Sequence, residues 1–342
     1  WDAARQFAAV ATGSMGGEPN PDPLQRIRLQ ELGRIVEMHV HDLTGLDTVF
    51  PELHPVSPGV WAQRTLDAYR PLFTELATSL SANSGSDDLE VADPMMAMIA
   101  NLSRMMAPAM LGMAVGSMVG RMAGRMFAQY DLPIPRQENG LLVITANIES
   151  FASDWSLPPD EVRLWVIAQE YIGHTLLAIP PVRDGLSALV RRYVGAFRPD
   201  SSSLADHLEH LDLGDADPMA AMQQLLGDPA VMLGAVQSAE QAALAPALDA
   251  AIAAVIGAVD YLVDAVAVRV IGGEALRIAE AVRRRRLETT PDDVFVERLL
   301  GLQLSQAQVQ RGKDFIAGVV DRARSEEHTS ELQSLAYLVC RL

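Results

Sequence analysis

The segment Ala168–His174 reads AQEYIGH and is two substitutions away from H-E-x-x-H, a helical zinc-binding motif. In that motif two histidines one turn apart bind one zinc ion, and the intervening glutamate acts as general base on the metal-bound water. Glu170 stands at the position of the base. The spacing therefore raises three alternatives: a metal site, the remnant of one, or an ordinary buried helix.

The residues at the two ligand positions, Gln169 and Gly173, are poorly suited to zinc. A glutamine offers a neutral amide oxygen, and a glycine offers no side chain. His174 lies one residue past the second ligand position, which rotates it by about 100° around a helix. Taken alone, Glu170 and His174 are more typical of a side-chain pair on one helix face.

Other histidines give weaker signals. His39 and His41 point apart on a helix, and His207 and His210 fall on an acidic segment that is typical of a solvated face. The chain has neither a P-loop, a G-x-G-x-x-G turn nor a G-x-S-x-G elbow. These patterns add no second candidate for catalysis.

The motif must be carried by helices, because the apolar residues recur at helical spacing along most of the chain. We expect helices at 24–42, from Pro58 to about 82, at 157–179 and 182–197, three short ones between 203 and 236, and others at 238–271, 273–288, 291–300 and from 305. Residues 1–23 are expected to form an irregular arm, and 140–147 (GLLVITAN) is the clearest strand. Ser57 and Ser156 are expected to be N-caps.

Composition restricts the partners. Hydrophobic residues make up 49% of the 342 residues, aromatic residues only 5%, and the net charge is −17. Such an acidic chain is a poor ligand for nucleic acid or an anionic membrane, which both attract Lys and Arg. We therefore expect a cytoplasmic protein whose partner is an unknown protein or peptide. The sequence does not decide whether the protein forms a homo-oligomer.

Four glycines recur every fourth residue, at Gly112, Gly116, Gly120 and Gly124. On a helix they share one face and permit close approach of another helix. The uncharged run between Arg104 and Arg121 has 16 residues, fewer than the roughly 20 that span a membrane. We therefore expect a close-packed helix, with an oligomerisation or scaffold face at 112–124 as the alternative.

Several long blocks resemble an actinobacterial family of zinc-dependent metallopeptidase-like and hydrolase-like proteins. The blocks include FAQYDLPIPR, LLVITANIESFASDWSLPPDEVRLWV and LLGDPAVMLGAVQSAEQAAL, and the resemblance covers about residues 90–322. It implies histidines where this chain has Gln169 and Gly173, and a downstream glutamate ligand where this chain has Ile256. Three expected zinc ligands are thus replaced.

The resemblance predicts a mainly α, zincin-like helical domain at 93–323 with a very small β element, after an N-terminal arm and helical region at 1–92. The tail 324–342 resembles a translated sequencing adapter. The favoured hypothesis is that the protein is a non-catalytic member of this family, in which Glu170 is a vestigial general base. Zinc is the cofactor that the resemblance implies for the family, but we expect no cofactor to be bound here. The alternative is an active metallohydrolase with a rearranged site. Its weak candidate metal ligands are His174 and Asp260, and Asp264 is a second carboxylate that could approach His174 from the same long helix as Asp260.

Overall fold

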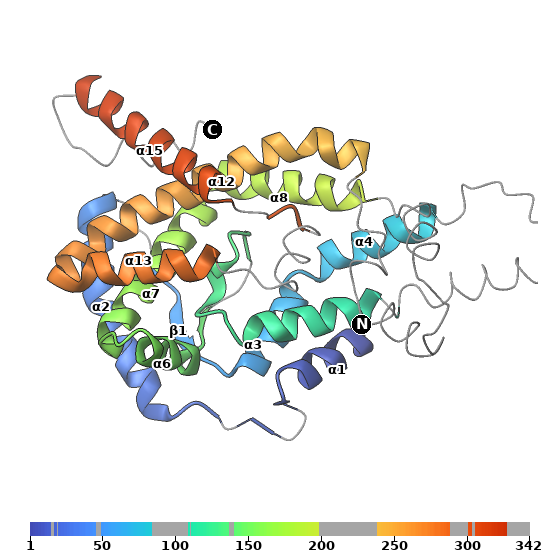
Figure 1. The fold of residues 1–342 in the computed structure, drawn as a ribbon, viewed down its shortest axis with the longest axis horizontal. Coiled ribbons are helices and arrows are strands. Elements are labelled where there is room, and N and C mark those ends of the chain that lie inside the picture. The colour runs from blue at the N-terminus through green and yellow to red at the C-terminus, as the bar shows by residue number, and fades with distance from the viewer. Residues whose placement is uncertain are drawn as a thin grey trace, which may run out of the picture.

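The computed structural model describes residues 1–14, 17–18, 20–45, 49–83, 109, 111–136, 140–197, 238–287, 300–302 and 305–326. These residues form α-helices around one two-stranded sheet (Figure 1). The prediction of a mainly α protein with a very small β element is confirmed. The expected helices at 203–211, 217–226, 229–236 and 291–300 lie outside the described residues, except for the end of the last one at Leu300.

The N-terminal part begins with two helices, α1 (Asp2–Ala11) and α2 (Pro23–Thr44). The prediction of an irregular arm is wrong for α1, which is held by tertiary contacts described below. Local signals set the ends of α2: Asp22 accepts a hydrogen bond from the Leu24 amide at 2.9 Å, and Gly45 ends the helix with a φ of 62°.

The helix expected from Pro58 to about residue 82 is two helices, α3 (Pro58–Ala68) and α4 (Arg70–Asn83). Ser57 caps α3 as predicted, because its side chain accepts from the Val60 amide at 3.3 Å. The break falls at Tyr69, just before Pro71. Proline has no amide hydrogen and its ring clashes with the carbonyl four residues earlier, which explains the break.

The sheet joins two segments far apart in the chain. Strand β1 (Glu52–Pro55) pairs in parallel with β2 (Gly140–Val143), and Leu53 lies opposite Leu141. The predicted strand at 140–147 is therefore correct in its first half. Its second half belongs to α6 (Thr145–Asp154), and β1 was not predicted because ELHP is short and carries a proline.

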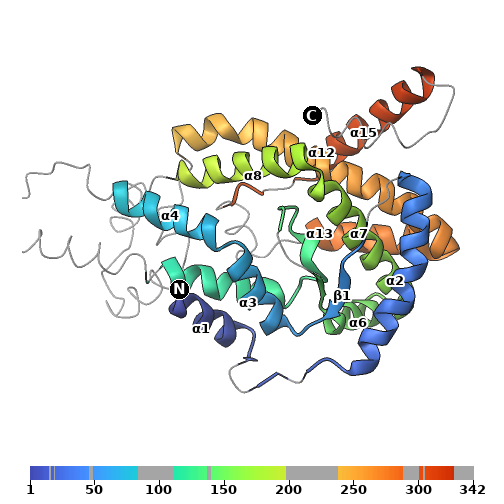
Figure 2. The same ribbon diagram turned by 180° about the vertical axis from the view of Figure 1, so that it is seen from behind.

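Helix α7 (Pro159–Ala178) carries the motif and lies beside α2 in both views (Figures 1 and 2). It packs against α2, α6 and the later helices α8 (Pro180–Gly195), α12 (Ala239–Val270) and α13 (Ala275–Leu287). The long helix α12 thus lies against the helix that carries the motif. The predicted cap at Ser156 is wrong: Ser156 lies in a turn with a φ of 51°, and Pro158 precedes the helix.

Helix α12 is the one described helix long and apolar enough to cross a membrane by length and composition. Within the fold, 67% of its most apolar window is buried. It packs closely on α15 (Gln306–Glu326), since a Cβ on Gly312 would lie 2.0 Å from the Ala253 carbonyl oxygen. Burial against neighbouring helices accounts for this apolar composition.

Three of the four spaced glycines, Gly112, Gly116 and Gly120, lie on a helix at 111–123 and are covered by α1; we call these three the glycine ladder. A Cβ on Gly116 would lie 2.1 Å from the Ala4 carbonyl oxygen, and one on Gly120 would lie 2.7 Å from that of Ala8. The expectation of a close-packed glycine face is therefore correct. The helix that packs on it belongs to the same chain.

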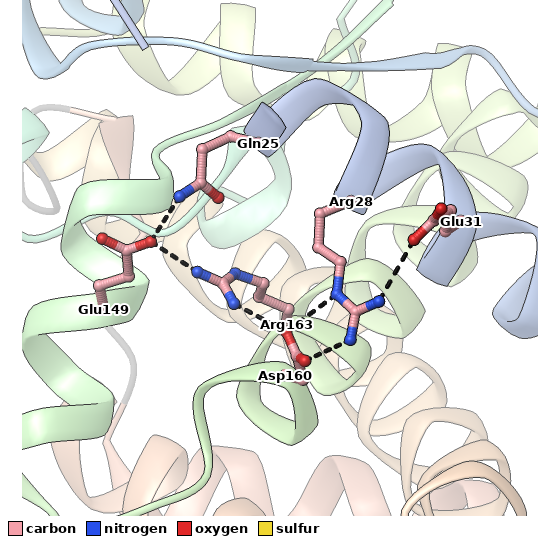
Figure 3. Close-up of polar contacts among 6 residues, drawn as sticks. All are labelled: Gln25, Arg28, Glu31, Glu149, Asp160 and Arg163. Carbon is pink, nitrogen blue, oxygen red and sulfur yellow. Dashed lines mark hydrogen bonds and ion pairs between the residues drawn. The ribbon is translucent and has the colours of Figure 1, made fainter. Parts of the chain in front are cut away.

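A polar network fixes α7 to the N-terminal part (Figure 3). The largely buried Arg163 guanidinium donates to Glu149 of α6 at 2.5 Å and to Asp160 at 2.7 Å. From α2, Arg28 donates to Asp160 and Gln25 donates to Glu149 at 2.7 Å. These contacts orient the first turns of α7 relative to α2 and α6.

The predicted boundary at 92/93 lies outside the described residues and stays a prediction. The buried residues before and after it belong to one hydrophobic cluster. The predicted boundary at 324 falls within the last turn of α15, which ends at Glu326, and the rest of that tail lies outside the described residues.

Candidate functional site

The motif lies in the middle of α7, as the sequence predicted. Pro159 at the first position and the acidic Asp160 and Glu161 favour the helix start, and the helix stops before Pro180. Gln169, Glu170 and Gly173 are all buried. Their surroundings therefore decide what chemistry is available.

A tight turn faces this part of α7. It contains the 3-10 helix η2 (Gln129–Asp131), which follows the glycine-ladder helix. The Asp131 carboxylate closes the turn by accepting from the amides of Phe127 and, at 3.3 Å, Ala128. We call residues 127–131 the docking turn, because its residues contact the motif positions Gln169, Glu170, Gly173 and His174.

Glu170 is fully buried and bound to the docking turn. Its two carboxyl oxygens accept backbone hydrogen bonds from Tyr130 at 2.8 Å and Gln129 at 3.2 Å. Burial, and secondly the charge of Asp131, raise the pKa of Glu170 well above its usual range, although the two amides act in the opposite direction. Burial therefore disfavours the ionised form of Glu170 relative to a carboxyl in water.

Gln169, at the first ligand position, contacts the same turn. Its side-chain amide donates to the Asp131 carboxylate at 2.8 Å. Its amide oxygen is buried, with no hydrogen-bond partner among the described residues. Gln169 thus joins α7 to the docking turn through its N–H group.

Gly173, at the second ligand position, leaves room for Tyr130. A Cβ on Gly173 would lie 3.0 Å from the Tyr130 Cβ and 3.2 Å from its Cγ. Both atoms are fixed close to the backbone of the turn, so a histidine at this position requires the turn to move. The space that a ligand side chain needs is filled by Tyr130.

His174 contacts the other end of the same tyrosine. Its Nδ1 lies 3.2 Å from the Tyr130 hydroxyl, and the two groups share a hydrogen bond whose direction depends on the imidazole tautomer. Burial lowers the pKa of His174, so the neutral ring is favoured.

The downstream positions do not complete a metal site. Ile256 is 6% exposed and belongs to the hydrophobic core. Asp260 is buried, but it pairs with Arg286 of α13 at 3.2 Å and with Arg283 at 3.6 Å. Asp264 pairs with Arg283 as well. These carboxylates bind arginines, and in the part of the chain that the structure describes, no three His, Cys, Asp or Glu side chains are grouped to hold a metal ion.

Sequence reasoning missed the docking turn. Asp131 closes this turn and binds Gln169. The FAQYD stretch gave no local signal of a partner for α7, because Tyr130 and Glu170 are 40 residues apart. The motif and its partner turn meet only in the folded chain.

The fold and site define a helical protein whose central helix carries a glutamate at the general-base position of a zinc motif. A model of the zincin-like metallopeptidase family matches residues 1–330, and the chain belongs to this family. Comparison with curated proteins gives no match.

The fold is also similar to a crystal structure from Chloroflexus aurantiacus described as a "putative hydrolase with a novel fold". The TM-score is 0.58 at 20% identity, over 94% of this chain and 87% of that one. At this identity the likeness concerns the fold.

The family implies zinc, but the donor groups that the structure describes at the motif do not fit it. Zinc in proteins is held by imidazole, thiolate or carboxylate groups, usually three of them in a catalytic site. Here Gln169 turns its N–H toward Asp131, Gly173 offers no donor, and both Glu170 oxygens accept amide hydrogens. His174 alone is an ordinary zinc ligand, and one ligand is too few.

Proposed function

We propose that this protein is a non-catalytic member of the zincin-like metallopeptidase family. The observation that best supports this proposal concerns Tyr130. Its side chain fills the space beside Gly173, and its backbone amide donates a hydrogen bond to the Glu170 carboxyl. In this proposal the former zinc helix has a structural role and holds the docking turn. A cytoplasmic location, the absence of a zinc cofactor and a protein or peptide partner belong to the same proposal.

The surroundings of Glu170 explain why it is unsuited to act as a base. A general base must be ionised and within hydrogen-bond distance of the water that it activates. Glu170 is fully buried, burial raises its pKa, and its oxygens already accept two amide hydrogens. Activating a water would require the docking turn to leave.

Metal analysis combined with a peptidase assay tests this proposal. Protein freed of metal and then equilibrated with zinc should retain far less than one zinc per chain and should not cleave a broad peptide library. The variant Glu170→Gln should leave both results unchanged, as should Glu280→Gln at an exposed position of α13. Stoichiometric zinc together with hydrolysis abolished by Glu170→Gln alone would overturn the proposal.

The two alternatives have less support. A rearranged metal site needs Asp260 to approach His174, but Asp260 is paired with Arg286. A scaffold face on the glycine ladder needs α1 to leave, because Ala4 and Ala8 cover Gly116 and Gly120. Light scattering of a variant that lacks α1 checks the second alternative, which requires a change of assembly state.

A further inference from the structure

A cleft of about 780 Å³ lies between α8, α12 and α15, and its floor includes Leu176 of the motif helix α7. Its walls come from the N-terminal half of α8, the middle of α12 and the N-terminal half of α15. In Figures 1 and 2, α8 and α12 lie side by side and α15 crosses α12. The volume falls within the range of about 300–1,000 Å³ that is typical of small-molecule sites.

The floor of this cleft is apolar and reaches the core. Leu176 and Leu186 are each 3% exposed, Ile316 is 1% exposed and Ala258 is fully buried. The mouth carries exposed residues, including Ala250 of α12 and Phe315 of α15. Protein interiors are normally close-packed, so an apolar cleft of this depth loses packing contacts unless a ligand fills it.

Polar groups gather on one part of the wall, where α12 and α15 approach. Among the described lining residues the charged ones are Asp249 of α12 and Arg311 of α15, and Gln308 lies one turn before Arg311. Burial raises the pKa of Asp249, while a hydrogen bond from Gln308 and the charge of Arg311 lower it by less. Arg311 is exposed and has five N–H donors in a planar fork that matches a carboxylate.

We propose that this cleft binds a long-chain carboxylate, with its aliphatic chain on the apolar floor and its carboxylate on the Arg311 guanidinium. The aliphatic walls suit a flexible chain, which needs no hydrogen bonds. Binding of this carboxylate does not depend on whether the motif binds zinc.

A displacement titration tests the proposal on the whole chain. The probe is a dansyl-labelled undecanoic acid, whose fluorescence rises in an apolar site. The competitors are palmitate, hexadecanol and hexadecylamine, which share a chain length and differ in head group. We expect saturable binding of one probe per chain, displaced at least tenfold more effectively by palmitate than by either other compound.

Three variants locate the site. Ala250→Trp, which places a large ring at the mouth of the cleft, should weaken binding more than tenfold. Ala243→Trp is the matched control, since Ala243 is exposed on the same helix and does not line the cleft. Arg311→Gln should weaken palmitate binding about tenfold and leave hexadecanol unchanged. Circular dichroism checks that each variant is folded.

Four results would overturn the proposal. Absence of saturable binding, or equal affinity in Ala250→Trp and Ala243→Trp, removes the cleft as the site. Equal displacement by palmitate and hexadecanol, or preferential displacement by hexadecylamine, removes the carboxylate as the head group.

Discussion

Replacing Glu170 by Gln should change the stability of this protein in a pH-dependent way. The folded state raises the pKa of Glu170 well above its ordinary value of 4.5, with burial as the largest cause. The stability that this carboxyl contributes is therefore fully present below the unfolded pKa and is lost as the pH rises through the folded pKa. Glutamine has the same shape and does not titrate, so it lacks this loss.

The magnitude has two parts. Two backbone amides donate to Glu170, and a glutamine can accept from only one of them with its amide oxygen. At low pH this mismatch should make Glu170→Gln less stable than wild type by about 1–3 kcal/mol. Above the unfolded pKa, wild type should lose about 1.4 kcal/mol relative to the variant for each pH unit, up to the folded pKa.

The measurement is the free energy of unfolding in urea at several pH values between about 5 and 8, for wild type and Glu170→Gln. Subtracting the two curves removes the titration of all other groups. Glu280→Gln, at an exposed site of α13, is the matched control for the exchange of a carboxyl for an amide. A wild-type advantage that stays constant or grows with pH would refute the reasoning, since it would show that the two amides hold Glu170 ionised in spite of burial.

Three further predictions concern packing and buried charge. Gly116→Ala should cost about 1–3 kcal/mol in urea unfolding, because its Cβ meets a backbone oxygen of α1 at 2.1 Å. Its control Gly185→Ala has nothing within 4 Å and should gain about 0.5–1 kcal/mol, so equal effects of the two would count against the docking of α1. Gly312→Ala should lower the melting temperature for a similar reason at the α12–α15 crossing, and an unchanged melting temperature would contradict that contact. Asp260→Asn should cost about 2–4 kcal/mol in urea unfolding because Arg286 loses its partner, whereas a cost below about 0.5 kcal/mol would show that the pair is unimportant.

The helices were largely predictable because their signals are local. The apolar spacing and the Ser238 cap place α12 within a residue of its expected start, and Asp22 and Gly45 bound α2. Prediction failed where a distant contact decides the structure. Helix α1 forms against the glycine ladder, and β1 pairs with a strand more than 80 residues later.

For the candidate site, the sequence predicted the residues on α7 and did not predict the docking turn that contacts them. It placed Gln169, Glu170, Gly173 and His174 on a mid-chain helix, and it showed that two ligand positions lack ligand side chains. Asp260 illustrates the limit of such reasoning: a conspicuous acidic residue on the right helix is paired with an arginine of α13.

The sequence by itself determined which donor groups α7 can offer, since side-chain chemistry and helical spacing are properties of neighbouring residues. Only the tertiary structure decided what those groups contact. The docking turn lies about 40 residues before the motif, and its amides, its tyrosine and Asp131 meet α7 through packing of the whole core. A hydrogen bond or a close contact requires positions in space, and for such distant residues these are fixed by the fold.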